Sequence, residues 1–335
     1  MWGPLKEGRI QVEFFKSVNV DWLGKKWFFL GFSMIFSVAG VVSMAMHMSS
    51  IGSPVPLGID FRGGTDVQVQ FKSAPNIGQI RKALDAIGIH DAKIVSISGT
   101  MGQTGQNELL ISLPRDNNEN QLDAGRANIE KSLDAIAPGQ YTIQNISVVG
   151  PTVGRQLQKK AVVATLWSLL GMLVYLWFRF ELIYGVAAVV AVFHDTLITI
   201  GAFALTNQEM SLTVIAAILT LIGYSMNDTI VVFDRIRENL RMNRKESLPD
   251  LVNRSINQTL SRTVLTSGLT FLTVLSLFIY GGEVLHGFSF ALVIGILIGT
   301  YSSIAVAAPM LVAYQEWRGR KGQNTALPAA RGSKA

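Results

Sequence analysis

Long runs of apolar residues, rather than short alternating segments, dominate the pattern of this chain. Four runs contain no charged residue, and two contain one acid each, Asp195 and Asp228. A helix of about 20 residues crosses a hydrocarbon core of about 30 Å. The pattern therefore predicts a polytopic α-helical membrane protein with six transmembrane helices, at 27–48, 161–178, 182–205, 212–233, 263–280 and 288–314.

The segment between the first two runs has the pattern of a soluble α+β domain. Alternation of apolar and polar residues predicts strands, and apolar residues at helical spacing predict helices. The βαββαβ order that results is typical of a ferredoxin-like fold. We expect strand 65–72, helix 77–87, strands 92–97 and 108–113, helix 120–137 and strand 141–149.

Basic residues gather beside alternate ends of the apolar runs. Of the 29 Lys and Arg residues, 18 lie before run 1, between runs 2 and 3, between runs 4 and 5, or after run 6. The short loops 206–211 and 281–287 contain none. Because basic residues favour the cytoplasmic side, we expect both chain ends in the cytoplasm and the α+β domain outside.

The chain is thereby divided into five parts. Run 1 is too long for the apolar region of a signal peptide and has no cleavage site after it, so we expect it to remain as an anchor. The tail is polar and rich in Ala, Gly and Pro. The expected parts are a cytoplasmic segment 1–26, transmembrane helix 1 at 27–48, a periplasmic α+β domain 49–156, a bundle of five helices 157–316 with cytoplasmic loop 234–261, and a disordered cytoplasmic tail 317–335.

Composition narrows the class of function. Charged residues make up only 16% of the chain, against about 25% in soluble domains. The net charge of +6 lies next to the apolar runs, which argues against a nucleic-acid partner. No cysteine is present, which excludes disulfides and thiolate metal sites. Phosphate-loop, H-E-x-x-H and G-x-S-x-G motifs are absent, so we expect no enzyme activity, no cofactor and no metal.

Asp228 is the strongest candidate for chemistry. A carboxylate in a membrane helix costs roughly 2.5–3.5 kcal/mol on insertion scales, and such residues persist where they pair, face water or carry protons. Arg262 precedes the fifth run and is the predicted charge partner of Asp228, with Asn227 beside it as an auxiliary. Two plainer interpretations stay open. Asp228 could serve only to pair helices, and Arg262 could snorkel to lipid phosphate.

His194 and Asp195 form a second intramembrane polar pair. Counted from the inner ends of their runs, Asp195 lies roughly 20 Å deep and Asp228 roughly 8 Å deep. Carboxylates at two depths suit a stepwise proton path. The alternative, which stays open, is that His194 and Asp195 bond to each other in the protein interior and only hold two helices together.

Glycine motifs flank the α+β domain. The first holds Gly58, Asp60, Phe61 and the pair Gly63–Gly64, and it predicts a tight turn after helix 1. The second holds Gly150, Pro151 and Gly154 and predicts a hinge before helix 2. Gly295 and Gly299 have the G-x-x-x-G spacing that allows close helix packing, within the bundle or against a partner.

Together these motifs resemble a known family. They are Gly-Ile-Asp-Phe-Arg-Gly-Gly-Thr at 58–65, Val-Gly-Pro-Thr-Val-Gly at 149–154, Phe-Arg-Phe-Glu at 178–181, His-Asp at 194–195, Gly-Tyr-Ser-Met-Asn-Asp at 223–228 and Ser-Arg-Thr-Val-Leu-Thr-Ser-Gly at 261–268. In this order they resemble the SecF branch of the SecD/SecF family, within the resistance-nodulation-division superfamily. The resemblance covers roughly residues 14–316.

The resemblance implies partners and a function. It implies a bacterial inner-membrane subunit that pairs with SecD, associates with the SecYEG channel, and uses proton influx to help unfolded preproteins across the bilayer. YajC is a further candidate partner. The resemblance also ties Asp228 and Arg262 to proton coupling. Two alternatives remain: a subunit that only stabilises the translocase, and a stand-alone proton-coupled exporter of the same superfamily.

Overall fold

A computed structural model describes residues 19–89, 92–97, 107–114, 124–180, 182–243 and 246–320. Within these residues, six helical segments are long and apolar enough to cross a membrane, as predicted. They are α1 (Lys26–Ile51), α5 (Pro151–Arg179), α6 (Leu182–Thr206), α7 (Leu212–Met242), α8 (Leu248–Tyr280), and a last segment made of α9 (Gly282–Ser302), a π-helical turn (Ser303–Ala307) and α10 (Ala308–Arg320).

The α+β domain has the predicted order of elements. After the short helix α2 (Ile59–Arg62) come β1 (Gly64–Phe71), α3 (Ile77–Ala86), β2 (Lys93–Ile97), β3 (Glu108–Pro114), α4 (Ala124–Ile136) and β4 (Tyr141–Val149). The strands form one sheet in the order β2-β3-β1-β4, and every neighbouring pair is antiparallel. This is the ferredoxin-like topology that the sequence predicts.

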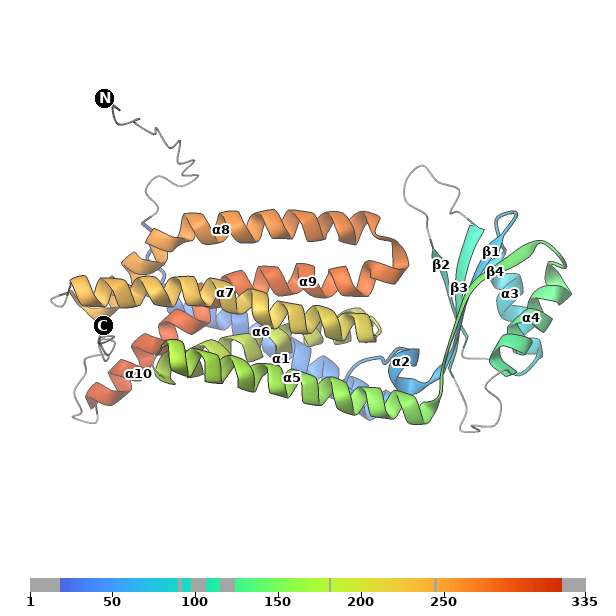
Figure 1. The fold of residues 1–335 in the computed structure, drawn as a ribbon, viewed down its shortest axis with the longest axis horizontal. Coiled ribbons are helices and arrows are strands. Elements are labelled where there is room, and N and C mark those ends of the chain that lie inside the picture. The colour runs from blue at the N-terminus through green and yellow to red at the C-terminus, as the bar shows by residue number, and fades with distance from the viewer. Residues whose placement is uncertain are drawn as a thin grey trace, which may run out of the picture.

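The two faces of the sheet differ because side chains alternate along a strand. Val67, Val69 and Phe71 of β1 are buried in a core that also holds Ile80 of α3 and Leu133 of α4. The polar residues between them face the membrane bundle. Figure 1 shows the sheet standing across one end of the bundle, with α3 and α4 on its far side.

Helices α6, α7 and α9 form the centre of the bundle. Half or more of the apolar stretch of each of these spans is buried, whereas less than a fifth of the apolar stretch of α1, α5 or α8 is buried. Helices α1 and α6 cross where two glycines meet: a Cβ on Gly40 would lie 2.9 Å from the Cα of Gly201. The outer faces of α1, α5 and α8 are apolar and open to lipid or to another subunit.

The ends of the helices that carry the basic clusters lie together. In Figure 1, α10 and the neighbouring ends of α5, α7 and α8 are at the end of the bundle opposite the sheet. Arg179 at the end of α5 lies 3.4 Å from Asp234 of α7. The basic segments therefore share one side of the bundle, as the charge pattern predicts.

The connection expected at 234–261 is largely helical, because α7 continues to Met242 and α8 begins at Leu248. Polar contacts hold these extensions together: the buried amide of Asn239 donates to Ser255 Oγ at 2.8 Å and to Gln258 Oε1 at 2.9 Å. Helix α10 continues to Arg320, into the expected tail. The remaining tail and residues 1–18 lie outside the described residues.

Candidate functional site

Asp195 is the centre of a hydrogen-bonded cluster that joins four helices. Its side chain is fully buried in α6. Ser225 of α7 and Ser302 of α9 donate to its Oδ2 atom at 2.6 and 2.7 Å. Nδ1 of His194 lies 3.0 Å from Oδ1, and Nε2 of the same ring contacts the Ser33 hydroxyl of α1. With the ring proton on Nδ1, His194 donates to Asp195 and accepts from Ser33.

Asp228 is bound only by hydroxyls among the described residues. It is 2% exposed, and its Oδ2 accepts from Ser267 of α8 at 2.6 Å and from Thr300 of α9 at 3.4 Å. A buried carboxylate is costly unless a charge or a proton balances it. Among the described residues, Asp228 therefore has hydroxyl partners and no cation to balance its charge.

The two carboxylates lie at nearly one level of the bundle. Asp195 binds Ser225, one helical turn from Asp228 on α7, and their partners on α9 are two residues apart, Ser302 and Thr300. The predicted difference of roughly 12 Å in depth is therefore too large. The error arose because α7 extends to Met242, so its inner end could not serve as a depth marker. A rise of 1.5 Å per residue puts the difference near one turn, about 5 Å.

The predicted ion pair between Asp228 and Arg262 is not formed in the chain. Arg262 is exposed on the surface of α8. It precedes Ser267 by five residues, and at 3.6 residues per turn the two side chains are about 140° apart around the helix. Since Ser267 binds Asp228, Arg262 points away from it. Asn227 is likewise exposed.

An apolar groove leads to the Asp228 site from outside the bundle. It has a volume of 350 Å³ and lies between α8 and α9. Ser267 and Thr300, both partners of Asp228, are among its lining residues, with Trp22, Phe271 and Tyr301. Asp228 is thus one hydrogen bond away from a surface that the described residues leave open.

The two glycine motifs meet in one junction. Gly63 has a φ of +79°, and a Cβ there would lie 3.0 Å from the Pro151 backbone. A Cβ on Gly154 would lie 2.8 Å from the carbonyl oxygen of Phe61, which is buried. Gly64 has a φ of +151°, and a Cβ there would lie 2.5 Å from Leu113 O. The motifs therefore lock the start of α5 against α2.

The predicted hinge between Gly150 and Gly154 is not a break in the chain. Gly150 is the N-cap of α5, Pro151 follows it in the first turn, and the helix then continues without interruption to Arg179. Proline suits the first turn of a helix because its missing N–H has no partner there. The sheet thus passes from β4 directly into a membrane-spanning helix.

Gly295 and Gly299 both face α7. A Cβ on Gly295 would lie 2.4 Å from Cδ2 of Leu221, and one on Gly299 would lie 3.0 Å from Cβ of Ser225. Close packing here brings α9 near enough for Thr300 and Ser302 to reach the two carboxylates. The G-x-x-x-G spacing therefore serves packing within the bundle.

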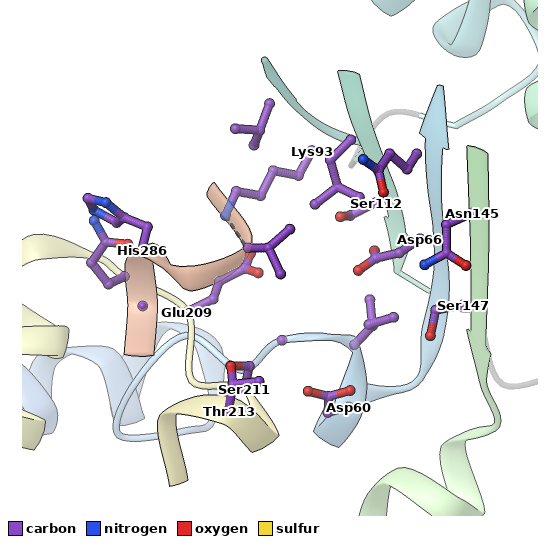
Figure 2. A pocket seen from close by; sticks show the side chains of 18 residues that line it. Asp60, Asp66, Lys93, Ser112, Asn145, Ser147, Glu209, Ser211, Thr213 and His286 are labelled. Atoms are coloured by element: carbon purple, nitrogen blue, oxygen red, sulfur yellow. Dashed lines mark hydrogen bonds and ion pairs between the residues drawn. The ribbon is translucent and has the colours of Figure 1, made fainter. Parts of the chain in front are cut away.

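A second polar region lies between the sheet and the bundle. The polar face of the sheet and the outer loops of the bundle line a cavity of 290 Å³. Figure 2 shows Asp60, Asp66 and Glu209 around it, with Lys93 reaching from β2 to Glu209. The Lys93 Nζ atom lies 3.2 Å from Glu209 Oε1. Asp66 Oδ1 is buried and has no hydrogen-bond partner among the described residues.

Burial raises the pKa of Asp66 above its ordinary value of 3.8. The Ser112 hydroxyl and Lys93 oppose this change, and the carboxylates of Glu209 and Asp60 add to it. The folded chain therefore holds this proton more tightly than the unfolded chain. The stability that this proton contributes is present at low pH and is lost as pH rises through the raised pKa.

We expect Asp66→Asn to remove this pH dependence. Hydrogen exchange of the sheet amides, corrected for intrinsic rates, is the measurement, at neutral and mildly acidic pH. In the wild type, protection should increase on acidification below the raised pKa. In the variant, which carries a neutral amide at both pH values, the increase should be smaller. An equal increase in both proteins would contradict the prediction.

Sequence reasoning identified both acids and the contact of His194 with Asp195, but it missed the hydroxyl groups of the two clusters. Ser33, Ser225, Ser267, Thr300 and Ser302 are ordinary residues in membrane helices, and no local pattern distinguishes them. Their spacing offered one signal. Ser225 precedes Asp228 by three residues, and Thr300 precedes Ser302 by two, so each pair lies within one helical turn.

Comparisons with known proteins agree with this architecture. Residues 128–317 match the family described as protein export membrane protein SecD/SecF, C-terminal, and residues 49–75 match the SecD/SecF GG motif. The protein translocase subunit SecF of Koribacter versatilis is 51% identical, over 95% of this chain and 96% of that protein. The SecF subunit of Calditerrivibrio nitroreducens is 41% identical, over 90% and 96%.

A solved structure has the same fold. The crystal structure of SecDF from Thermus thermophilus, a translocon-associated membrane protein, aligns with a TM-score of 0.75 and 36% identity. The alignment covers 90% of this chain but 39% of the SecDF chain. This chain therefore spans about two fifths of that longer protein.

Proposed function

Because this chain belongs to the SecD/SecF family of protein export membrane proteins, we propose that it is a SecF-type subunit of the protein translocase. It pairs with SecD in a bacterial inner membrane, with both chain ends in the cytoplasm and the α+β domain in the periplasm. It associates with the SecYEG channel, with YajC as a further partner. It performs no covalent chemistry of its own.

The single observation that supports proton coupling is the hydroxyl-only environment of Asp228. The residue is buried in a span, and its hydrogen-bond partners in the described chain are Ser267 and Thr300. A carboxyl group held in this way can load a proton without breaking an ion pair. Asp195, one turn away, gives the proton a second carboxyl with serine hydroxyls beside it.

Arg262 acts from the surface that contacts SecD. An exposed guanidinium at the inner part of a spanning helix has either lipid phosphate or another subunit as its neighbour. Since the outer face of α8 is open among the described residues, a SecD helix can pack there and contact Arg262. A charge partner of Arg262 would then be supplied when the two subunits assemble.

Translocation in inner-membrane vesicles tests the function. Completion of preprotein export is followed with and without a proton gradient, in vesicles that contain or lack this chain. We expect the gradient to accelerate completion only when the chain is present with SecD. Equal stimulation in both kinds of vesicle would contradict proton coupling through this subunit. If vesicles that lack this chain also lose SecD from the membrane, and the gradient has no effect in either kind of vesicle, the result would favour a stabilising role.

A further inference from the structure

The helices that carry the two buried acids are joined by one short loop, and this loop contacts the α+β domain. Asp195 lies in α6 and Asp228 in α7, and residues 207–211 connect them. Three kinds of contact hold this connection: two with the segment between α1 and β1, and one with β2. All three lie at the end of the bundle that faces the sheet (Figure 1).

The first contact is made by the backbone. Met210 N donates to Pro56 O at 2.8 Å, and Gly58 N donates to Met210 O at 2.8 Å. Leu57 and Met210 therefore form a parallel bridge between two otherwise irregular segments. A Cβ on Gly58 would lie 3.2 Å from Met210 O, so this close approach depends on glycine.

The second and third contacts are made by charged side chains. Asp60 Oδ2 accepts from the Leu212 backbone N at 2.8 Å, which satisfies one of the free N–H groups at the start of α7. Glu209 pairs with Lys93 of β2 at 3.2 Å. Figure 2 shows both acids on the loop side of the cavity, with Lys93 extending across it. The loop is thus fixed to the domain through α2 and through the sheet.

Close to this loop, the junction of the two glycine motifs fixes β4 and α5. Gly154 packs on the Phe61 carbonyl, and Phe61 belongs to the same short helix as Asp60. Helix α2 therefore contacts both α5 and the start of α7. The described contacts therefore hold the domain on the bundle at both α5 and the start of α7.

We propose that the 207–211 loop is a mechanical clamp that carries movements of α6 and α7 into the α+β domain. The domain moves with these helices as one rigid body and does not swing about Gly150–Gly154. This inference rests on the proposed function, because it assigns the clamp a role in coupling protonation of Asp195 and Asp228 to events outside the membrane.

A reversible cross-link tests whether the clamp stays closed. The chain has no cysteine, so a Leu57→Cys/Met210→Cys variant carries a single possible disulfide. Bridged strands lie about 4.7–4.9 Å apart, within the 4.4–6.8 Å range of Cα separations that a disulfide needs. We expect the oxidised variant, in vesicles with SecD, to keep the full gradient-dependent stimulation. Loss of stimulation on oxidation, restored by a reductant, would overturn the proposal.

A matched pair within the sheet controls for oxidation. Gln70 and Thr142 are opposite each other on β1 and β4, and the Gln70→Cys/Thr142→Cys variant cross-links the domain to itself. Its stimulation should be the same before and after oxidation. A loss in the 57–210 variant alone would therefore mean that the clamp opens during the cycle.

Breaking the clamp is the complementary test. Glu209→Lys places a cation against Lys93, and we expect a loss of stimulation together with faster hydrogen exchange at the Gly58 and Met210 amides. Adding Lys93→Glu should restore both. The control is Glu130→Lys, which breaks the exposed Arg126–Glu130 pair of α4 and should leave both readouts unchanged. Unchanged stimulation and exchange in Glu209→Lys would overturn the clamp.

The two failures can be told apart in the same vesicles. If the wild type shows no gradient-dependent stimulation, the proposed function fails. If the wild type is stimulated and Asp228→Asn is not, while Glu209→Lys behaves as the wild type, the clamp alone fails.

Discussion

The Asp228→Asn variant is expected to lose the gradient-dependent stimulation of translocation in vesicles. Its complex with SecD should still assemble. The amide has nearly the size of the carboxyl, and its oxygen can still accept from Ser267 at the 2.6 Å position. What it cannot do is bind and release a proton. The measurement is completion of preprotein export with and without a gradient, with SecD copurification as the check on assembly.

The structural cost of this change is small, which makes the result interpretable. Exchanging one acceptor in a neutral hydrogen bond costs about 1 kcal/mol. The buried carboxylate is itself unfavourable, so the amide removes a charge that the described chain does not balance. A fall in activity without a fall in SecD copurification therefore reports on the proton and not on folding.

A second carboxyl on the same helix provides the control. Asp234 lies six residues after Asp228 on α7. It is exposed and pairs with Arg179 at 3.4 Å. Asp234→Asn makes the same chemical change at the inner end of α7, and stimulation should persist. If Asp228→Asn assembles and retains stimulation, the coupling role of Asp228 is wrong and the stabilising role becomes the better account.

The fold could be predicted because each of its signals is local. Six apolar runs of sufficient length report helices in a membrane, and strict alternation in segments such as β1 reports a strand with one buried face. The errors occurred where polar residues continue a helix beyond the membrane. Asn239 is buried against Ser255 and Gln258, a contact between two polar segments that no hydrophobic pattern reveals.

The site was predicted in part, because a local signal marks its acids but not their partners. A single acid in an apolar run is conspicuous, so Asp195 and Asp228 could be found from composition alone. The pairing with Arg262 was wrong because depth was considered and rotation about the helix axis was not. Ser267 and Arg262 are separated by five residues, and only a packed structure shows which of the two faces α7.

The junction of the two glycine motifs was beyond sequence reasoning. Each motif was recognised as a turn or a hinge, since glycine is expected where the backbone bends. Their sequence separation, from Gly63 to Gly154, hid the fact that they touch. Residue 154 is glycine because the backbones of α5 and α2 approach closely there, and not because either backbone bends.

Gly154→Ala is therefore expected to destabilise the protein, although alanine is the better helix former. The new Cβ would lie 2.8 Å from Phe61 O and 3.0 Å from Phe61 C. These are backbone atoms that cannot rotate away, and forcing an extra carbon into such a contact costs about 1–3 kcal/mol. Relief requires α5 to move from α2, which also disturbs Asp60 and its bond to the start of α7.

Gly171→Ala on the same helix separates this clash from the helix propensity of alanine. Gly171 is exposed and has no atom within 4 Å of the position a Cβ would take, so alanine should be neutral there or stabilising by up to about 1 kcal/mol. Thermal unfolding in detergent is the measurement, with trypsin cleavage at the base of the α+β domain as a second readout. A lower midpoint for Gly154→Ala, beside an unchanged or higher one for Gly171→Ala, would establish that backbone contact between the two motifs holds the domain on the bundle. Equal midpoints for the two variants would mean that the junction yields easily, and the domain would then be free to move on α5.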